Sequence, residues 1–597
     1  MADHLPGFGM PLNYLPTMPD NSPLVEPFDM FHHTLIDLYS ARLRTVRERT
    51  MVALMNHLTD KPDWDRKIFE DAIVSKWKQE SSSQTQDITD SMLSWCMAEV
   101  KDKAKVFQAT GTIVALDEGV MKSDSLVSDV INASFKDAVK PLEQVGEKYL
   151  DWHPGSDRKV LDLVHPSLFC LIYGVSKILP SSTVGLEDCE KRCGEGVVLD
   201  LPREEDLIIH KINPWEDCPE NKSWSKKFQW LPCEVKLDPK DGSAKIVSYI
   251  NNLPPEGNET LYSLIEQVIS SAIPLWNGSL MRTNRHSRRR IDDEECNWVY
   301  AEDYEELEPP DTDEEDSDDY WEHQRQHQRQ NRILEVADCG EYISETERTY
   351  DTFRDDKTGL LKEEEIVDLR KDFGKEGLQV IVKLANIVLT PEKPEYGGGT
   401  WHIEGMLNEH ICATALYYYD CSNITESRLA FRAKVNSDIA MSYEQDDHEG
   451  PERTYGFQNE EPAVIEIGDV LAREGRLVTF PNTLQHCVRP FKLADPTKPG
   501  HRKILALFLV DPHLRAISTA NVPCQQKSSW EKHIRREGLL EKLPEELKQQ
   551  VISDVEDFPI SLEQAKRFRE ELMEERSRFV ESQTNKYLNE TFSLCEH

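Results

Sequence analysis

The chain has 597 residues and a net charge of −39, with 38% hydrophobic and 30% charged side chains. This length predicts about three to five domains, and the negative charge disfavours binding to nucleic acid or to anionic membranes. The first fifteen residues lack the basic and apolar segments of a secretory signal, and the thirteen scattered cysteines are typical of reduced thiols, so we expect a cytoplasmic or nuclear protein that is not secreted.

The first 180 residues are predicted to be mainly helical. Apolar residues recur near the helical period from about residue 28 to 78, through 85–150 and again through 158–180. Residues 181–281 are expected to mix strand and helix and to pack on the core. Within them, 226–252 has the pattern of a β-hairpin, and a helix over about 259–273 is expected to end before Pro274.

Residues 282–332 form the most strongly charged segment. A cluster of arginines leads into residues 302–319, which hold twelve acidic side chains and no basic one. This composition cannot bury enough apolar surface to fold alone, so we expect a disordered insertion. It is either a solvated loop or, through residues 292–319, a surface for a basic protein partner, with a role in nuclear import also open.

The strand pattern is clearest over residues 376–522, after a helical connector at 333–375. Short β-rich runs are separated by turn residues without helices between them, which predicts an antiparallel sandwich or barrel. Residues 523–597 are charged and helical in pattern. The chain is therefore predicted to be α+β, with a β core between a helical N-terminal region and a helical C-terminal tail.

One candidate site lies in this β core. His402 and Glu404 are two residues apart, so on a strand they face the same side, and His486 follows on a later strand. Two imidazoles and one carboxylate leave about three coordination positions open, which is the preferred set of non-haem Fe(II) oxygenases. Arg502 opens the next strand and could hold the carboxylate of a co-substrate through two hydrogen bonds.

This order of residues resembles the double-stranded β-helix, a jelly-roll or cupin-like fold, of the 2-oxoglutarate-dependent oxygenases. The run from Phe480 to Arg502 is similar to the prolyl-hydroxylase branch in particular. The resemblance implies Fe(II) and 2-oxoglutarate as cofactors, metal ligation by His402, Glu404 and His486, and a 2-oxoglutarate carboxylate on Arg502. It further implies hydroxylation or another oxidation of a C–H bond in an unknown substrate, either a small metabolite or a protein side chain.

The chain as a whole resembles a large fungal family catalogued only as domain of unknown function number 4246. The blocks that carry this resemblance are 59–64, 229–233, 248–253, 401–405, 408–411 and 510–513. Two features depart from the oxygenase pattern: Glu404 stands where Asp is more common, and sixteen residues separate His486 from Arg502.

Three questions remain open at this level. Arg489 competes with Arg502, but it lies an odd number of residues from His486 and so should face away from the metal on a regular strand. Tyr417 could hydrogen-bond 2-oxoglutarate or could be an aromatic residue of the core. The alternative to an enzyme is a non-catalytic interaction protein, in which the barrel is a scaffold and the acidic insertion binds a basic partner.

Overall fold

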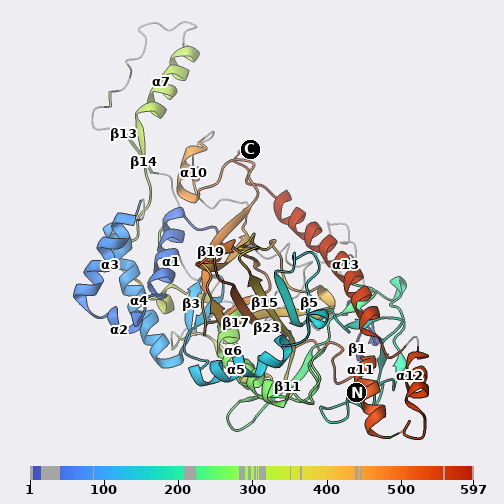
Figure 1. Cartoon of the computed structure of the whole chain (residues 1–597). Coiled ribbons are helices and arrows are strands. Elements are labelled where there is room, and N and C mark those ends of the chain that lie inside the picture. Colours follow the sequence, from blue (N-terminus) through green and yellow to red (C-terminus); the bar gives the residue numbers. More distant parts are fainter. Residues whose placement is uncertain are drawn as a thin grey trace.

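The structure is a computed structural model that describes residues 4–14, 40–84, 87–207, 224–281 and, with short gaps, 289–594. Antiparallel sheets form its centre and helices lie at both ends of the chain, so the fold is mixed α+β (Figure 1). None of the helices in these residues combines the length and the apolar composition that crossing a bilayer requires.

The first four N-terminal helices pack beside one edge of the main sheet, and the fifth packs against one of its faces. They are α1 (Val46–Leu58), α2 (Trp64–Lys67), α3 (Asp71–Gln84), α4 (Asp90–Thr110) and α5 (Asp129–Glu143). The longest of them, α4, begins at Thr89, whose hydroxyl accepts a hydrogen bond from the backbone of Met92. It ends at Gly111, where φ is 74°, a conformation that glycine adopts without strain. Helices are confirmed over much of this span, but residues 113–123, which were also predicted to be helical, form the paired strands β3 (Ile113–Leu116) and β4 (Val120–Ser123). The part of the prediction between residues 28 and 39 lies outside the described residues.

The prediction of a helix over residues 158–180 is wrong. The segment contains the strands β6 (Val160–Val164), β7 (Leu171–Ile172) and β8 (Lys177–Ile178). β6 pairs with β15 (Leu378–Leu389) and places Asp162 opposite Ala385. A short apolar run fits a buried strand as well as a buried helix, and here pairing with the sheet decides the outcome.

Four antiparallel strands form the middle of a ten-stranded main sheet. In spatial order they are β15, β23 (Gly500–Val510), β17 (Ile411–Ser422) and β20 (Leu477–Pro481). The edges are extended by β11 (Cys233–Leu237) and β12 (Ala244–Ile246) on one side, and by β4 (Val120–Ser123) and β3 (Ile113–Leu116) on the other. The pairing of β11 with β12 confirms the predicted hairpin.

One face of the main sheet is covered by α6 (Glu259–Leu280), which continues past Pro274 although we expected it to end there. Proline has no N–H to donate to the carbonyl of Ser270 one turn earlier. That carbonyl instead accepts a hydrogen bond of 2.9 Å from the guanidinium of Arg370. The helix is also buried along most of its length, so packing outweighs the missing backbone bond.

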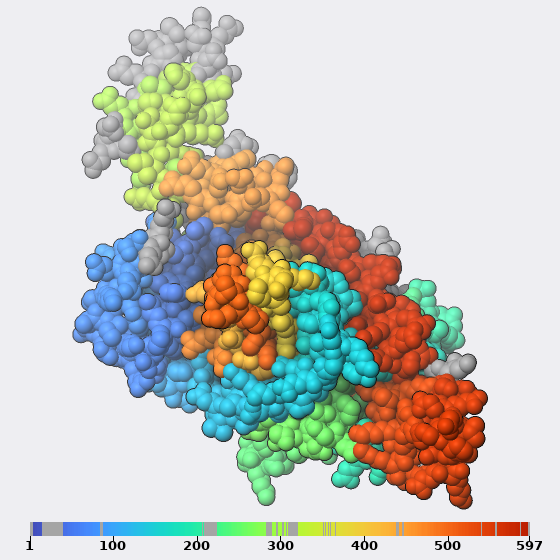
Figure 2. Space-filling view, in the orientation of Figure 1, coloured from blue at the N-terminus to red at the C-terminus, as the bar shows by residue number. Residues whose placement is uncertain are grey.

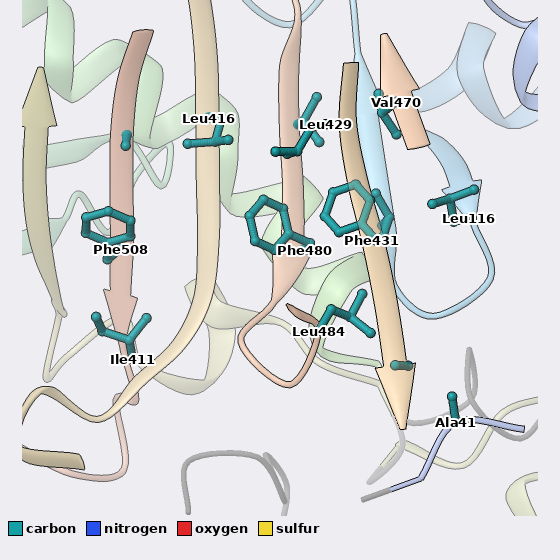
Figure 3. Close-up of a cluster of buried hydrophobic side chains, with 14 of the residues drawn as sticks. Ala41, Leu116, Ile411, Leu416, Leu429, Phe431, Val470, Phe480, Leu484 and Phe508 are labelled. Carbon is teal, nitrogen blue, oxygen red and sulfur yellow. The ribbon is translucent and has the colours of Figure 1, made fainter. Parts of the chain in front are cut away.

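The other face of the main sheet packs against a second, smaller sheet. This sheet has the order β19 (Val464–Ala472), β18 (Ser427–Lys434), β21 (Gln485–Val488), and beside it β16 (Glu395–Tyr396) pairs with β22 (Phe491–Lys492). Phe508 and Phe480 from the main sheet belong to one buried cluster with Leu429 and Phe431 from the second (Figure 3). The predicted antiparallel sandwich is thus confirmed, and within the described residues the two sheets do not close into a barrel.

The charged insertion is partly ordered, contrary to the expectation of disorder. β13 (Asn297–Tyr300) pairs with β14 (Arg332–Glu335), and α7 (Ser317–Asn331) lies beyond them, so these elements form an arm that projects from the body (Figures 1 and 2). Arg290, at its base, is buried and donates to Glu99 and Asp117. These buried carboxylates need a counter-charge, which explains why one arginine of the basic cluster enters the core.

The C-terminal tail is helical, as predicted. It consists of α11 (Lys527–Arg536), α12 (Glu545–Ser553) and α13 (Leu562–Asn589). α13 runs along one side of the molecule (Figure 1) and buries Leu572, Phe579 and Tyr587. Its charged face is solvated, while its apolar face packs on the sheets.

Candidate metal centre

The side chains of His402, Glu404 and His486 lie together, although His486 comes 82 residues after Glu404 in the chain. One ligand atom from each side chain lies within 4.8 Å of the others. The convergence begins in the backbone: His402 and His486 form an antiparallel bridge, in which each N–H donates to the other residue's carbonyl at 3.2 and 3.0 Å. Since directly bridged residues project their side chains to the same face, the two rings lie beside each other, 4.4 Å apart.

Glu404 is held by Asn482 from the turn that leads into β21. The Asn482 amide oxygen accepts from the backbone N–H of Glu404, and its amide nitrogen donates to the Glu404 carbonyl, both at 2.9 Å. The next residue, Gly405, has φ at 73°, where a side chain would contact Ile411 and Glu409. The glycine therefore turns the chain immediately after the carboxylate, and Asn482 fixes that turn to the segment that carries His486.

Among the described residues, the Nε2 atoms of the two histidines and Oε1 of Glu404 face one another and have no other side-chain partner. Nδ1 of His402 lies 2.8 Å from the Thr400 carbonyl, so it carries the proton and Nε2 presents a lone pair. Nε2 of His402 and of His486 lie 3.8 and 3.4 Å from Oε1 of Glu404. Nδ1 of His486 has no hydrogen-bond partner in the described part of the chain, and the rings of Phe480 and Phe431 pack beside this imidazole instead.

The electrostatics favour the protonation states that bind a metal. Desolvation, followed by the neighbouring His486, lowers the pKa of His402 to about 4. Burial opposes ionisation of Glu404, but the neighbouring imidazoles of His486 and His402 lower its pKa to about 2. His402 therefore holds a neutral imidazole and Glu404 an anion at neutral pH. The donor set fits a divalent transition metal, and the side chain of His402, 35% exposed, marks the open side.

Arg502 lies on β23 and faces the space between the two sheets. It is 3% exposed, and one of its terminal nitrogens donates to the Ser427 hydroxyl at 2.8 Å. Its Nε is buried without a hydrogen-bond partner among the described residues, and its guanidinium lies 5.6 Å from the ring of Tyr418. Ser427 belongs to the strand whose Phe431 pairs with His486, so Arg502 and the triad border the same interior.

Lys383 is a residue of this interior that the sequence reasoning missed. It lies on β15 opposite Ala506 of β23, next to the buried Ile381 on the same face. Its ammonium group forms no hydrogen bond or ion pair with another described residue, yet it is near enough to act electrostatically on His402 and Glu404. A single lysine within the apolar run 380–389 is the signal that could have identified it.

Tyr417 is not brought to the site. It is fully buried on the face of the main sheet that α5 and α6 cover, where its hydroxyl donates to Asn132 at 2.6 Å and its ring meets Phe135. The core interpretation is therefore correct and the co-substrate contact predicted for Tyr417 is not. The adjacent Tyr418 points to the opposite face, toward Arg502, as strand alternation requires.

Arg489, the alternative to Arg502, lies outside the interior. It forms an ion pair with Glu466 and extends over the ring of Trp401 at 5.7 Å. Its side chain is 37% exposed. The alternation argument thus placed Arg489 correctly on the outer face.

A second group of two histidines and one carboxylate lies near the edge of the main sheet. His153, Asp162 and His165 bring one ligand atom each within 4.8 Å of the others. Nδ1 of His153 is 2.8 Å from Asp162, and Nδ1 of His165 accepts the backbone N–H of Ser167 at 3.2 Å. The guanidinium of Arg569 lies 3.9 Å from the same carboxylate. Both Nδ1 atoms and one oxygen of Asp162 are therefore already occupied by hydrogen bonds and a nearby cation, while the other oxygen of Asp162 is buried without a hydrogen-bond partner among the described residues.

The comparisons with known proteins identify a family without a named activity. The family model described as "Protein of unknown function (DUF4246)" matches residues 90–533, and the model of its N-terminal domain matches residues 5–80. No curated protein matches the chain's sequence.

Solved structures offer only distant likenesses. An Fe(II)/α-ketoglutarate-dependent dioxygenase, TqaL, is 17% identical with a TM-score of 0.16, over 23% of this chain and 44% of that one. A BsmA homologue from Methylobium petroleophilum is 12% identical with a TM-score of 0.16, over 25% and 48%. IDO from Bacillus thuringiensis is 10% identical with a TM-score of 0.14, over 30% and 67%. The chain thus spans about half the length of the first two structures.

Proposed function

The chain belongs to the DUF4246 family, and we propose from its own residues that it is an Fe(II)- and 2-oxoglutarate-dependent oxygenase. The observation that carries this proposal is the convergence of His402, Glu404 and His486 beside an interior whose far end holds the buried Arg502. Two imidazoles and one carboxylate are the ligand set that leaves room on iron for a bidentate co-substrate and O2.

The fold that fits this proposal is an open double-stranded β-helix. Of the nine strands in the 378–510 core, the first, ninth, third and sixth (β15, β23, β17 and β20) are neighbours in the main sheet, and the fifth, fourth and seventh (β19, β18 and β21) are neighbours in the second sheet. This alternation of strands between two facing sheets is how a jelly roll is wound. This winding brings the segment before β17 next to strand β21 at one end of the two sheets, where the candidate metal ligands lie.

Arg502 and Lys383 would bind the two ends of 2-oxoglutarate. On the inner face of β15 and β23, the pair Lys383–Ala506 lies four residues from the pair Ile387–Arg502, about 13 Å along the strands. Arg502, with Ser427, would receive the carboxylate distant from the metal. Lys383, which acts on His402 and Glu404, is placed to neutralise charge beside the metal.

When bound, iron and 2-oxoglutarate would supply the O2-dependent oxidation of a substrate C–H bond, with release of succinate and CO2. The protein's own part is ligation, orientation and exclusion of water. Phe431 and Phe480 line the site beside His486, so its buried side is apolar. The open side at His402 is where a substrate, whether a small metabolite or a protein side chain, would approach.

The test is iron binding and 2-oxoglutarate turnover by the purified chain. We expect one Fe(II) per chain and slow conversion of 2-oxoglutarate to succinate even without a substrate, measured by metal analysis and by NMR. The variants His402→Ala and His486→Ala should lose both. His501→Ala is the matched control, because His501 is a half-buried histidine that pairs with Asp420 outside the triad. Stoichiometric iron in both ligand variants, or no conversion by the unaltered chain, would overturn the proposal.

A further inference from the structure

The C-terminal helix α13 contacts the candidate metal centre through Tyr587. This tyrosine is 2% exposed and packs with Ile403, which is itself 4% exposed and lies between His402 and Glu404 in the chain. Its hydroxyl donates to the carbonyl of Thr483 at 3.0 Å. One side chain of α13 thus contacts both segments that carry the candidate metal ligands.

Each of these two contacts lies next to the geometry that forms the site. Thr483 directly follows Asn482, whose amide forms two hydrogen bonds with the backbone of Glu404. It precedes His486 by three residues on the way into β21. The ring of Tyr587 therefore packs against Ile403 in the His402–Glu404 segment. Its hydroxyl bonds to the turn that holds Glu404 and leads to His486.

A second contact of α13 holds the other end of the same segment. Arg576 forms an ion pair of 2.6 Å with the fully buried Glu409, and its guanidinium stacks on Trp230 at 3.7 Å. Glu409 also accepts the backbone N–H of Met406 at 2.6 Å, so the ion pair reaches the residue that follows Gly405. Arg576 and Tyr587 are eleven residues apart, about three helical turns, and hence lie on one face of the helix.

Beyond α13 the chain is anchored again, which fixes the helix along its axis. Phe592 exchanges backbone hydrogen bonds with Glu460 and Glu461, and its ring stacks on Phe457 at 3.6 Å. α13 is therefore restrained on both sides of Tyr587. This helix lies outside residues 5–80 and 90–533, which the family models match.

We propose that Tyr587 is a positioning residue for the metal ligands, and that α13 thereby helps to set the geometry of the site. The inference rests on the proposed function, because it assumes that His402, Glu404 and His486 hold a metal. Tyr587 does not ligate the metal; it sets the distance between the two ligand-bearing segments. Groups that orient metal ligands from outside typically change metal affinity by about 10- to 100-fold when removed.

The experiment measures Co(II) binding by the full-length chain, by calorimetry and by the visible spectrum of the bound ion. We expect Tyr587→Ala to weaken Co(II) binding about tenfold and to alter the spectrum, because ring and hydroxyl are both lost. Tyr587→Phe keeps the ring and should recover most of the affinity. All measurements are made well below the unfolding temperature of each variant.

Tyr249 supplies the matched control. It is 4% exposed and its hydroxyl also donates to a backbone carbonyl at 3.0 Å, that of Val522, outside the candidate metal centre. Tyr249→Ala and Tyr249→Phe should lower the unfolding temperature but leave Co(II) affinity and spectrum unchanged. A role of Tyr587 in stability alone would make the two pairs of variants behave alike.

The outcomes separate this inference from the proposed function. If the unaltered chain binds Co(II) and Tyr587→Ala binds it with the same affinity and spectrum, the positioning role is wrong and the metal site stands. Where Tyr587→Ala does not fold, the comparison of Tyr587→Phe with Tyr249→Phe decides, and a shift in the Co(II) spectrum in the first alone supports the role. A chain that binds no Co(II) through His402 and His486 overturns both proposals.

Discussion

Two groups of two histidines and one carboxylate occur in the described residues, and they differ in what surrounds them. In the group of His402, Glu404 and His486, the facing nitrogens and carboxylate oxygen have only one another as partners within the described part of the chain. In the group of His153, Asp162 and His165, a backbone N–H occupies one imidazole and Arg569 lies beside the carboxylate. A metal must compete with protons and cations for its ligands, so the list of donors does not by itself identify a site.

The second group is better explained as a hydrogen-bonded pair that stabilises the sheet edge. Burial lowers the pKa of His165 well below its usual value, so the ring is neutral. With Nδ1 accepting from Ser167, the proton of this neutral ring is on Nε2, which then offers no lone pair to a metal. His153 donates its Nδ1 proton to Asp162, whose charge is further balanced by Arg569.

The largest effect that separates the two groups is metal binding itself. His402→Ala and His486→Ala should abolish stoichiometric Fe(II) or Co(II) binding, because each removes one of three ligands. His153→Ala and His165→Ala should keep the full metal content. Metal analysis of all four variants under anaerobic conditions makes the comparison, and loss of metal in the second pair would show that the surroundings do not decide between the groups.

The next effect concerns Arg502 and Arg489, the two arginines that compete for the co-substrate carboxylate. Arg502→Ala should weaken 2-oxoglutarate binding by about 3 kcal/mol, roughly a hundredfold, because a desolvated charge-assisted contact is lost. Arg489→Ala should change it little, since Arg489 lies on the outer face with Glu466. Calorimetric titration of the metal-loaded chain with 2-oxoglutarate measures both, and exchanged phenotypes would mean that the assignment of the inner face is wrong.

A structural role for the second group predicts a loss of stability without a loss of metal. Asp162→Asn should lower the free energy of unfolding by about 3 kcal/mol, because it removes the buried charge that faces His153 and Arg569. Asp157→Asn is the control, since Asp157 is 65% exposed and its solvated ion pair with Lys393 should contribute little to stability. Urea unfolding of the metal-free chain measures the difference, and equal losses in the two variants would contradict the assignment.

Lys383 acts electrostatically on both groups and provides the finest test. It acts electrostatically on His402 and Glu404 and also on Asp162 and His165. Lys383→Met should leave metal content and stability nearly unchanged but weaken 2-oxoglutarate binding by about 1.5 kcal/mol, roughly tenfold. If stability falls while 2-oxoglutarate affinity is kept, the lysine serves the second group and not the first.

The convergence of His402, Glu404 and His486 could be predicted because it depends on local alternation and residue chemistry. His402 and Glu404 share a face in any extended segment, and a histidine on a later strand completes a known donor set. Tyr417 failed on the same rule, because alternation fixes which residues share a face but not which face is inner. Asn482, Ser427 and Tyr587 could not be predicted at all, since each acts through contacts between segments far apart in the sequence.

The fold predictions failed where tertiary contacts replace a local rule. Pro274 stays inside α6 because Arg370 satisfies the carbonyl that the proline leaves free. Residues 158–180 form strands because β15 offers an edge to pair with. Arg290 is buried although it belongs to a basic, polar run, because carboxylates from three other segments surround it. None of these partners is close in sequence to the residue it controls.

The ladder between β13 and β14 has a consequence for engineering the chain. Asn297 and Glu335 are paired, so the two ends of the arm lie one strand spacing apart, about 5 Å. A short turn could therefore replace the arm beyond this pair without displacing the rest of the structure. A fluorescent domain could be inserted at the same position for the same reason. The cut must fall after Asp293, which is buried and paired with Arg289, because Arg289 and Arg290 belong to the body and not to the arm.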